Sequence, residues 1–217
     1  MPRPRKDSGL PSAQERMEQA FWTLLERHPY SQISMKEVTR LAEVNHNTFY
    51  YHYSGLDELA ESAMQHSIPH ELVAAVLRGF TGSDEALARL IGDPTLSNHM
   101  EHLCHAASER SSPRMRAMVR GAIRQTWFDI LDIDPQAMGP NSQLAVEAAL
   151  GVFMALFSYR AEHSTDMTLV ELLRTDSAGQ LRAMLPVWVM SALAADGAIP
   201  ASRADATMMG RAHEEEA

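Results

Sequence analysis

The chain holds a single cysteine, Cys104, in 217 residues. An intrachain disulfide is therefore impossible, and a zinc site built from several cysteines is excluded. No apolar run reaches the roughly 18 residues that span a bilayer, and the basic segment Met1–Lys6 is not followed by the apolar stretch of a secretory signal. These absences predict a cytoplasmic protein without a membrane partner.

Sequence signatures of catalysis are also missing. The chain has no phosphate-binding glycine loop, no dinucleotide-binding fingerprint, no nucleophile elbow and no zinc-protease helix motif. We therefore expect a protein that is not an enzyme and that uses no cofactor and no metal.

Positive charge is scarce, because 19 Lys and Arg residues stand against 28 Asp and Glu residues, for a net charge of −9. Residues 1–60 hold seven of these cations and eight of the acids, so the acidity belongs mainly to the rest of the chain. The balance argues against coating of nucleic acid without regard to sequence, which needs many cations. A near-neutral N-terminal module can still bind DNA if its few cations face the phosphates.

Where the sequence has a regular pattern of apolar residues, the spacing is that of helices. Ser12 with Glu15 and Ser34 with Glu37 have the spacing of capping boxes that open two helices, and no strand-like alternation is seen. The predicted fold is all-α, with a three-helix helix-turn-helix domain followed by a larger helical regulatory and dimerisation domain. The predicted parts are a disordered basic arm (1–11), a helix-turn-helix domain (12–58), an effector-binding and dimerisation domain (59–198) and a flexible acidic tail (199–217).

Residues 33–59 have the layout of a helix-turn-helix, in which the second of two short helices lies in the major groove. Asn45 is placed to cap that helix, which then presents hydrogen-bonding and flat side chains. This pattern predicts binding to double-stranded DNA. The residues predicted to contribute to the interface are Ser34, Lys36, Asn45, His46, Asn47, Thr48, Tyr50 and Tyr51.

The run from Thr48 to Tyr53 (TFYYHY), with Leu59 after it, resembles the DNA-binding domain of the TetR family of transcriptional regulators. The resemblance covers about 50 residues. It implies an all-helical homodimer on a pseudo-palindromic operator, usually a repressor released by a ligand. It also implies phosphate contacts from Ser34, Lys36, Thr48 and Tyr50, and base contacts from His46, Asn47 and Tyr51.

Three residues depart from the pattern of that family. Glu43 stands where the turn usually has glycine, which would store about 1 kcal/mol of strain if the position needs a positive φ. Thr39 replaces a small alanine against the recognition helix. Leu56 stands where a lysine that contacts phosphate is common, which puts that contact in doubt.

Two later segments, about 144–159 and 181–193, are apolar on more than one face. Such helices must be buried on several sides, so we expect them to form the core of a two-fold dimer. The predicted interface residues are Leu150, Met154, Phe157, Leu181, Leu185 and Trp188.

The chain holds 14 methionines, a residue that lines adaptable apolar pockets as well as irregular cores, and Met100, Met115, Met118 and Met154 point to such a pocket. We expect it to hold a small, largely apolar effector, oriented by His99 or His102. The predicted lining consists of His99, Met100, His102, Leu103, Met118, Ile123 and Phe153.

Other interpretations remain open at this stage. His99, His102, Cys104 and His105, with Glu101 between them, could hold a zinc ion or a haem, which leaves a helical metal-dependent enzyme as an alternative. A helical adaptor that binds protein is another. The row formed by Arg116, Arg120 and Arg124 is read as a solvated face or a site for an anion. The effector, the operator and the direction of regulation cannot be named from the sequence.

Overall fold

The computed structural model describes residues 11–81, 94–163, 167–200 and 202, and these residues form ten α-helices and no strand. The prediction of an all-α protein is therefore confirmed for the described part of the chain. The predicted basic arm, apart from Pro11, and the predicted acidic tail, apart from residues 199, 200 and 202, lie outside the described residues.

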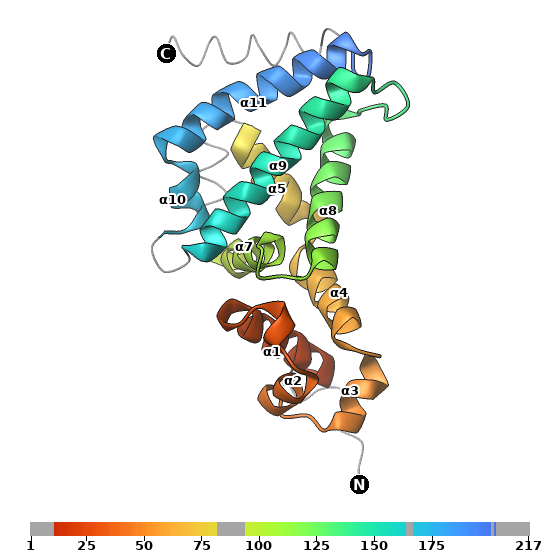
Figure 1. Ribbon diagram of the computed structural model, residues 1–217, viewed down its shortest axis with the longest axis vertical. Coiled ribbons are helices and arrows are strands. Elements are labelled where there is room, and N and C mark those ends of the chain that lie inside the picture. Colours follow the sequence, from red (N-terminus) through yellow and green to blue (C-terminus); the bar gives the residue numbers. More distant parts are fainter. Residues whose placement is uncertain (1–10, 82–93, 164–166, 201, 203–217) are drawn as a thin grey trace.

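Three helices gather at one end of the molecule (Figure 1). They are α1 (Ala13–Arg27), α2 (Met35–Leu41) and α3 (His46–His52), with a short 3-10 turn (Tyr30–Gln32) after α1. Both expected capping boxes are formed, at Ser12 and at Ser34. Phe21, Val38 and Phe49, all fully buried, join the three helices into one core. The helix α4 (Leu56–Ser67) packs on α1 and leads into the larger body.

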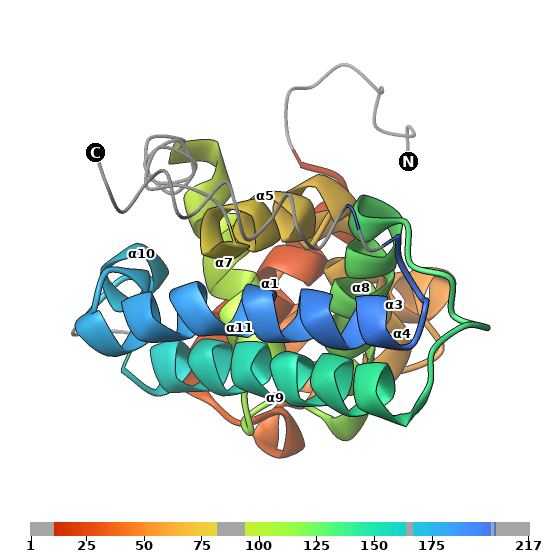
Figure 2. The ribbon, with the colours of Figure 1, turned by 90° about the horizontal axis from the view of Figure 1, so that it is seen from above.

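The body consists of α5 (His70–Thr81), α7 (Pro94–Ala107), α8 (Pro113–Leu131), α9 (Pro140–Glu162), α10 (Leu169–Leu173) and α11 (Asp176–Ala195). The long helices α9 and α11 lie side by side over its outer face (Figure 2). α9 is long and apolar enough to cross a membrane by length and composition, with 44 % of its most apolar window buried in the protein. A core helix that crosses no membrane passes the same test, so the feature does not establish a span.

Asp196, just after α11, holds the start of α9. Its carboxylate accepts hydrogen bonds from the Ser142 backbone N–H at 2.8 Å and the Ser142 hydroxyl at 2.7 Å. A Cβ on Gly139 would lie 2.8 Å from Asp196 Cγ, so only glycine allows this close approach. An anion at a helix N-terminus is stabilised by the orphan N–H groups and the helix dipole. The hydrogen bonds from Ser142 lower the pKa of Asp196 below its usual value of 3.8.

Replacing Asp196 with Asn should lower the free energy of unfolding near neutral pH. The lowered pKa means that the ionised carboxylate stabilises the fold above its unfolded pKa, and that this stabilisation is lost as the pH falls through the folded pKa. Chemical denaturation of Asp196→Asn and wild type should therefore show a deficit at about pH 7 that shrinks at about pH 3. An equal deficit at both pH values would contradict the role of the charge.

Candidate nucleic-acid interface

The turn between α2 and α3 is closed by backbone hydrogen bonds and braced from α1. The N–H of Val44 donates to the Thr39 carbonyl at 3.0 Å, and Arg16 Nε donates to the Ala42 carbonyl at 3.0 Å. Glu43 has a φ of +54°. The turn therefore needs the left-handed conformation that glycine adopts most readily, and Glu43 holds it at a cost of about 1 kcal/mol. The sequence pattern gave no signal for the brace from Arg16.

Asn45 caps α3, as predicted from the sequence. Its Oδ1 accepts hydrogen bonds from the backbone N–H of Thr48 at 2.8 Å and from the Thr48 hydroxyl at 3.0 Å. Both groups are thus used inside the protein to fix the first turn of the helix. Asn45 therefore contributes to the predicted interface by fixing the start of α3 in place. The Thr48 hydroxyl still has oxygen lone pairs that can accept a hydrogen bond from a partner molecule.

The two faces of α3 differ sharply in exposure. Phe49 is fully buried and Tyr53, directly after the helix, is 4 % exposed. On the other face His46 and Asn47 are exposed, Tyr50 is 53 % exposed and Tyr51 is 84 % exposed. The His46 and Tyr50 rings lie 4.9 Å apart. The Tyr51 ring does not take part in the core, and its exposed surface is available to a partner.

Ser34 and Lys36 at the start of α2 are also exposed. Ser34 is engaged in the capping box, because its Oγ contacts both the Glu37 backbone N–H and the Glu37 carboxylate. Every residue of the predicted interface except the half-buried Thr48 is therefore exposed. Ser34 lies directly before α2, and the others lie on α2, on α3 or in the turn between them.

Glu18, which the sequence did not single out, ties the end of α3 to the rest of the protein. It is 7 % exposed and accepts hydrogen bonds from the Tyr53 hydroxyl at 2.9 Å and the Ser62 hydroxyl at 2.7 Å, with His66 Nδ1 at 3.1 Å. Burial raises the pKa of Tyr53 to about 12, so the phenol stays protonated and donates. The cluster joins α1, α4 and the residue that follows α3.

Tyr53→Phe should lower the free energy of unfolding by about 1.5–3 kcal/mol, the range for a hydrogen bond to a charged partner. The variant keeps the ring in the core and removes only the donor to Glu18. Urea denaturation would measure the loss, with Tyr50→Phe as the control, since Tyr50 is on the exposed face of α3. Equal stability of Tyr53→Phe and wild type would show that the Glu18 bond does not hold the helix.

The predicted effector-site residues lie mainly in the interior of the body. Leu103, Ile123 and Phe153 are 1 % exposed, Met100 is 7 % exposed, and Met118 and His102 are half-buried. His99 is half-buried and its Nδ1 lies 2.7 Å from the Ser67 carbonyl oxygen. An apolar cavity of about 220 Å³ opens elsewhere, between α5, α8 and α11, and is lined by Leu77, Arg78, Trp127, Ile130, Leu131, Pro186, Val189 and Met190.

Among the described residues, no group of three or more His, Cys, Asp or Glu side chains is placed to hold a metal ion. The sequence cluster from His99 to His105 is spread around α7, with the His99 and His102 rings 6.5 Å apart. Cys104 is fully buried and burial raises the pKa of its thiol, which keeps it protonated and unreactive.

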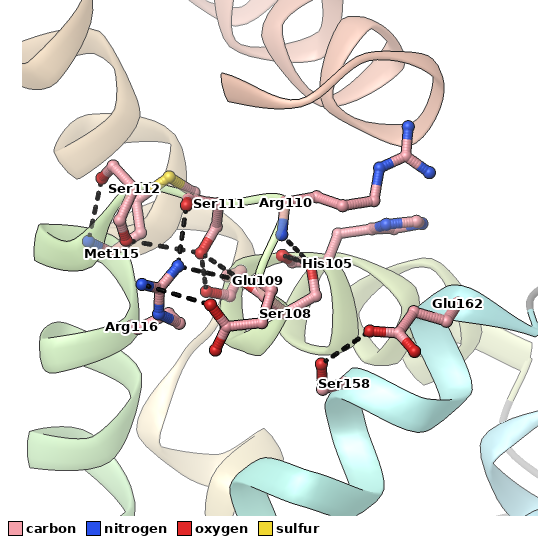
Figure 3. Close-up of polar contacts among 11 residues, drawn as sticks. His105, Ser108, Glu109, Arg110, Ser111, Ser112, Met115, Arg116, Ser158 and Glu162 are labelled. Atoms are coloured by element: carbon pink, nitrogen blue, oxygen red, sulfur yellow. Dashed lines mark hydrogen bonds and ion pairs between the residues drawn. The ribbon is translucent and has the colours of Figure 1, made fainter. Parts of the chain in front are cut away.

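The arginine row on α8 is paired with acids. Arg120 and Arg124 both contact Glu147 on α9, and Arg116 contacts Glu109 at 3.5 Å. Arg116 also donates to the Ser111 carbonyl at 2.9 Å, within the polar junction between α7 and α8 (Figure 3). The row is thus largely neutralised, which disfavours the anion-site interpretation of its spacing.

The predicted dimer residues divide into two groups. Leu150, Phe157 and Leu185 are buried within the protomer, at 0, 2 and 5 % exposure. Met154 and Leu181 are partly buried, and Trp188 is 44 % exposed. The same helices also carry exposed apolar side chains that the prediction did not include, namely Leu144, Tyr159 and Met184.

No protein-family model, no curated protein and no solved structure matches this chain. The functional argument therefore rests on the chemistry and geometry of its own residues.

Proposed function

We propose that this protein is a TetR-like transcriptional regulator that binds duplex DNA through α3. The observation that carries the proposal is the two-sided character of this helix. Phe49 anchors it in the core, while His46, Asn47 and the 84 %-exposed Tyr51 project from the other side. Asn and His side chains suit base edges and a tyrosine ring suits a thymine methyl, so this face has the chemistry of direct readout.

The surroundings of α3 support the same proposal. Lys36 and Tyr50 flank the exposed face and suit phosphate oxygens. The Arg16 brace and the Glu18 cluster fix the helix from behind. A rigid support of this kind is what positioning of a few side chains against base edges requires.

We further propose a homodimer built on the outer face of α9 and α11. Met184 and Trp188 are one helical turn apart on α11 and are 66 and 44 % exposed. Leu144 and Tyr159 on α9 add apolar surface at 67 and 45 % exposure. A two-fold dimer would bury this surface and present two copies of α3 to successive major grooves.

As regulation we propose release from DNA by a small, largely apolar effector. The apolar cavity between α5, α8 and α11 fits that class of ligand better than the packed positions expected from the sequence. Pro186, inside α11, lines this cavity, so the proposed dimer helix and the proposed ligand share a wall. A ligand that distinguishes two dimer conformations would thereby change DNA affinity.

Selection of bound duplexes from a random DNA pool tests the proposed function. We expect enrichment of a pseudo-palindrome whose half-sites lie about one helical turn, 34–36 Å, apart. Recovery of no preferred sequence above the unselected pool would contradict it. Enrichment of a single unrepeated half-site would support DNA binding and contradict the dimer.

A further inference from the structure

Five buried side-chain nitrogens lack a hydrogen-bond partner among the described residues, and all of them lie along one seam. They are Trp22 Nε1, His102 Nδ1, His105 Nδ1, and Nε and Nη1 of Arg160. We call this group the α1–α7–α9 seam, after the helices that carry it. An unpartnered buried polar group destabilises the fold, so the concentration of five such atoms in one place requires an explanation.

The contacts within the seam connect its members along α7. The Trp22 ring of α1 stacks on the His102 ring at 4.3 Å and 6°. His105 follows one turn later and lies close enough to His102 for its charge to lower the pKa of that ring, while the charges of Arg110 and Arg160 lower the pKa of His105 itself. Arg160 of α9 is 4 % exposed and donates through Nη2 to Glu101 on α7. Figure 3 shows His105 leaving α7 beside the Arg110 side chain.

The hydrogen-bonding chemistry of the seam is one-sided. The Arg160 guanidinium and the Trp22 indole can only donate. Burial lowers the pKa of His102 and of His105 to about 4, so both rings are neutral near pH 7, and each Nδ1 donates in one tautomer and accepts in the other. A molecule that satisfies the seam must therefore bring hydrogen-bond acceptors.

The charge of the seam favours an uncharged acceptor. Arg160 is already neutralised by Glu101, and the causes that shift the pKa values of Glu101 and Glu171 show that Glu26 and Glu171 also lie within electrostatic range of the pair. A carboxylate bound beside Arg160 would leave an excess negative charge in a buried place, which is costly. A carbonyl oxygen, unlike a carboxylate, accepts hydrogen bonds from the same N–H groups without adding charge.

We propose that the α1–α7–α9 seam is a binding site for a small uncharged aromatic carbonyl compound. The carbonyl oxygen accepts from Arg160 and His105, and the flat ring of the ligand lies against the Trp22–His102 stack. The unpartnered nitrogens are closed off from solvent, so entry requires α1 to separate from α7. The contact of α1 with α7 is less extensive than its contact with α4, and we take it as the contact that opens. The site is distinct from the cavity between α5, α8 and α11 and does not depend on DNA binding.

Titration with benzamide and acetophenone, without DNA, tests the site. We expect saturable one-to-one binding by calorimetry and a shift of the Trp22 indole N–H resonance in ¹⁵N-labelled protein. Arg160→Lys keeps the charge opposite Glu101 but removes the unpartnered guanidinium donors, and Trp22→Phe reduces the ring surface against which the ligand stacks. Each should weaken benzamide binding about tenfold, as expected for a loss of about 1.4 kcal/mol.

Arg120→Lys is the matched control, because Arg120 also pairs with a glutamate on a neighbouring helix but belongs to the α8 row. It should bind benzamide like wild type, and benzoate should bind wild type at least about tenfold more weakly than benzamide. The proposal is overturned if neither carbonyl compound saturates by about 10 mM, if Arg120→Lys is as impaired as Arg160→Lys, or if benzoate binds better. Should Arg160→Lys fail to fold, Trp22→Phe alone decides between these outcomes.

Discussion

Replacing both Met184 and Trp188 with glutamate is expected to give a folded monomer that binds its operator about 10²–10⁴-fold more weakly than wild type. The two side chains form an exposed apolar stripe on α11, and four added charges in a two-fold interface would repel across it. Loss of the dimer removes the effective concentration that the first bound half-site confers on the second, which accounts for the size of the loss. Light scattering and DNA titration would measure the two effects.

Leu41→Glu serves as the control for surface charge. Leu41 is a similarly exposed apolar residue, at 41 %, but it lies on α2. It should leave the molecular mass at that of the wild-type assembly. A double variant that stays dimeric at micromolar concentration would place the interface on another face, and a wild-type protein that is strictly monomeric would remove the dimer altogether.

The second large effect is expected on α3. Tyr51→Ala and Asn47→Ala should each reduce discrimination between the selected duplex and a scrambled one by about 1–3 kcal/mol, or roughly 5–150-fold. Both side chains are exposed and neither belongs to the core, so the loss should appear in binding and not in stability. DNA titrations at fixed salt with both duplexes would separate specific from non-specific affinity.

Lys36→Ala is the matched comparison, because Lys36 is also exposed but suits a phosphate. It should weaken binding to the two duplexes by a similar factor and reduce the salt dependence. If Tyr51→Ala and Asn47→Ala leave discrimination unchanged, α3 is not the helix that reads the bases. Thermal unfolding of each variant shows whether the fold is intact.

Local features of this protein were accessible to sequence analysis because short-range chemistry determines them. The capping boxes at Ser12 and Ser34 and the cap at Asn45 formed as expected, since each depends on residues three positions apart. The sequence raised a positive φ at Glu43 only as a condition, because Glu43 stands where the resembled family usually has glycine, and the structure shows that φ. The buried and exposed faces of α3 followed from its apolar spacing, with Phe49 inside and Tyr51 outside.

Contacts between distant segments were not accessible in the same way. Arg16, Glu18 and Asp196 look like ordinary surface charges in the sequence, yet they brace a turn, anchor the end of α3 and hold the start of α9. Burial depends on which helices meet, so Leu150 and Phe157 were expected at a dimer interface but fill the protomer core.

The sequence by itself determined the all-helical architecture of the described residues and the helical arrangement around α3, because periodicity and caps act within one or two turns. Only the tertiary structure decided where the apolar cavity opens and which charges are paired. It alone placed Trp22, His102, His105 and Arg160 along one seam. These outcomes depend on packing between helices that are up to about 140 residues apart in the chain, where no local pattern specifies the partner.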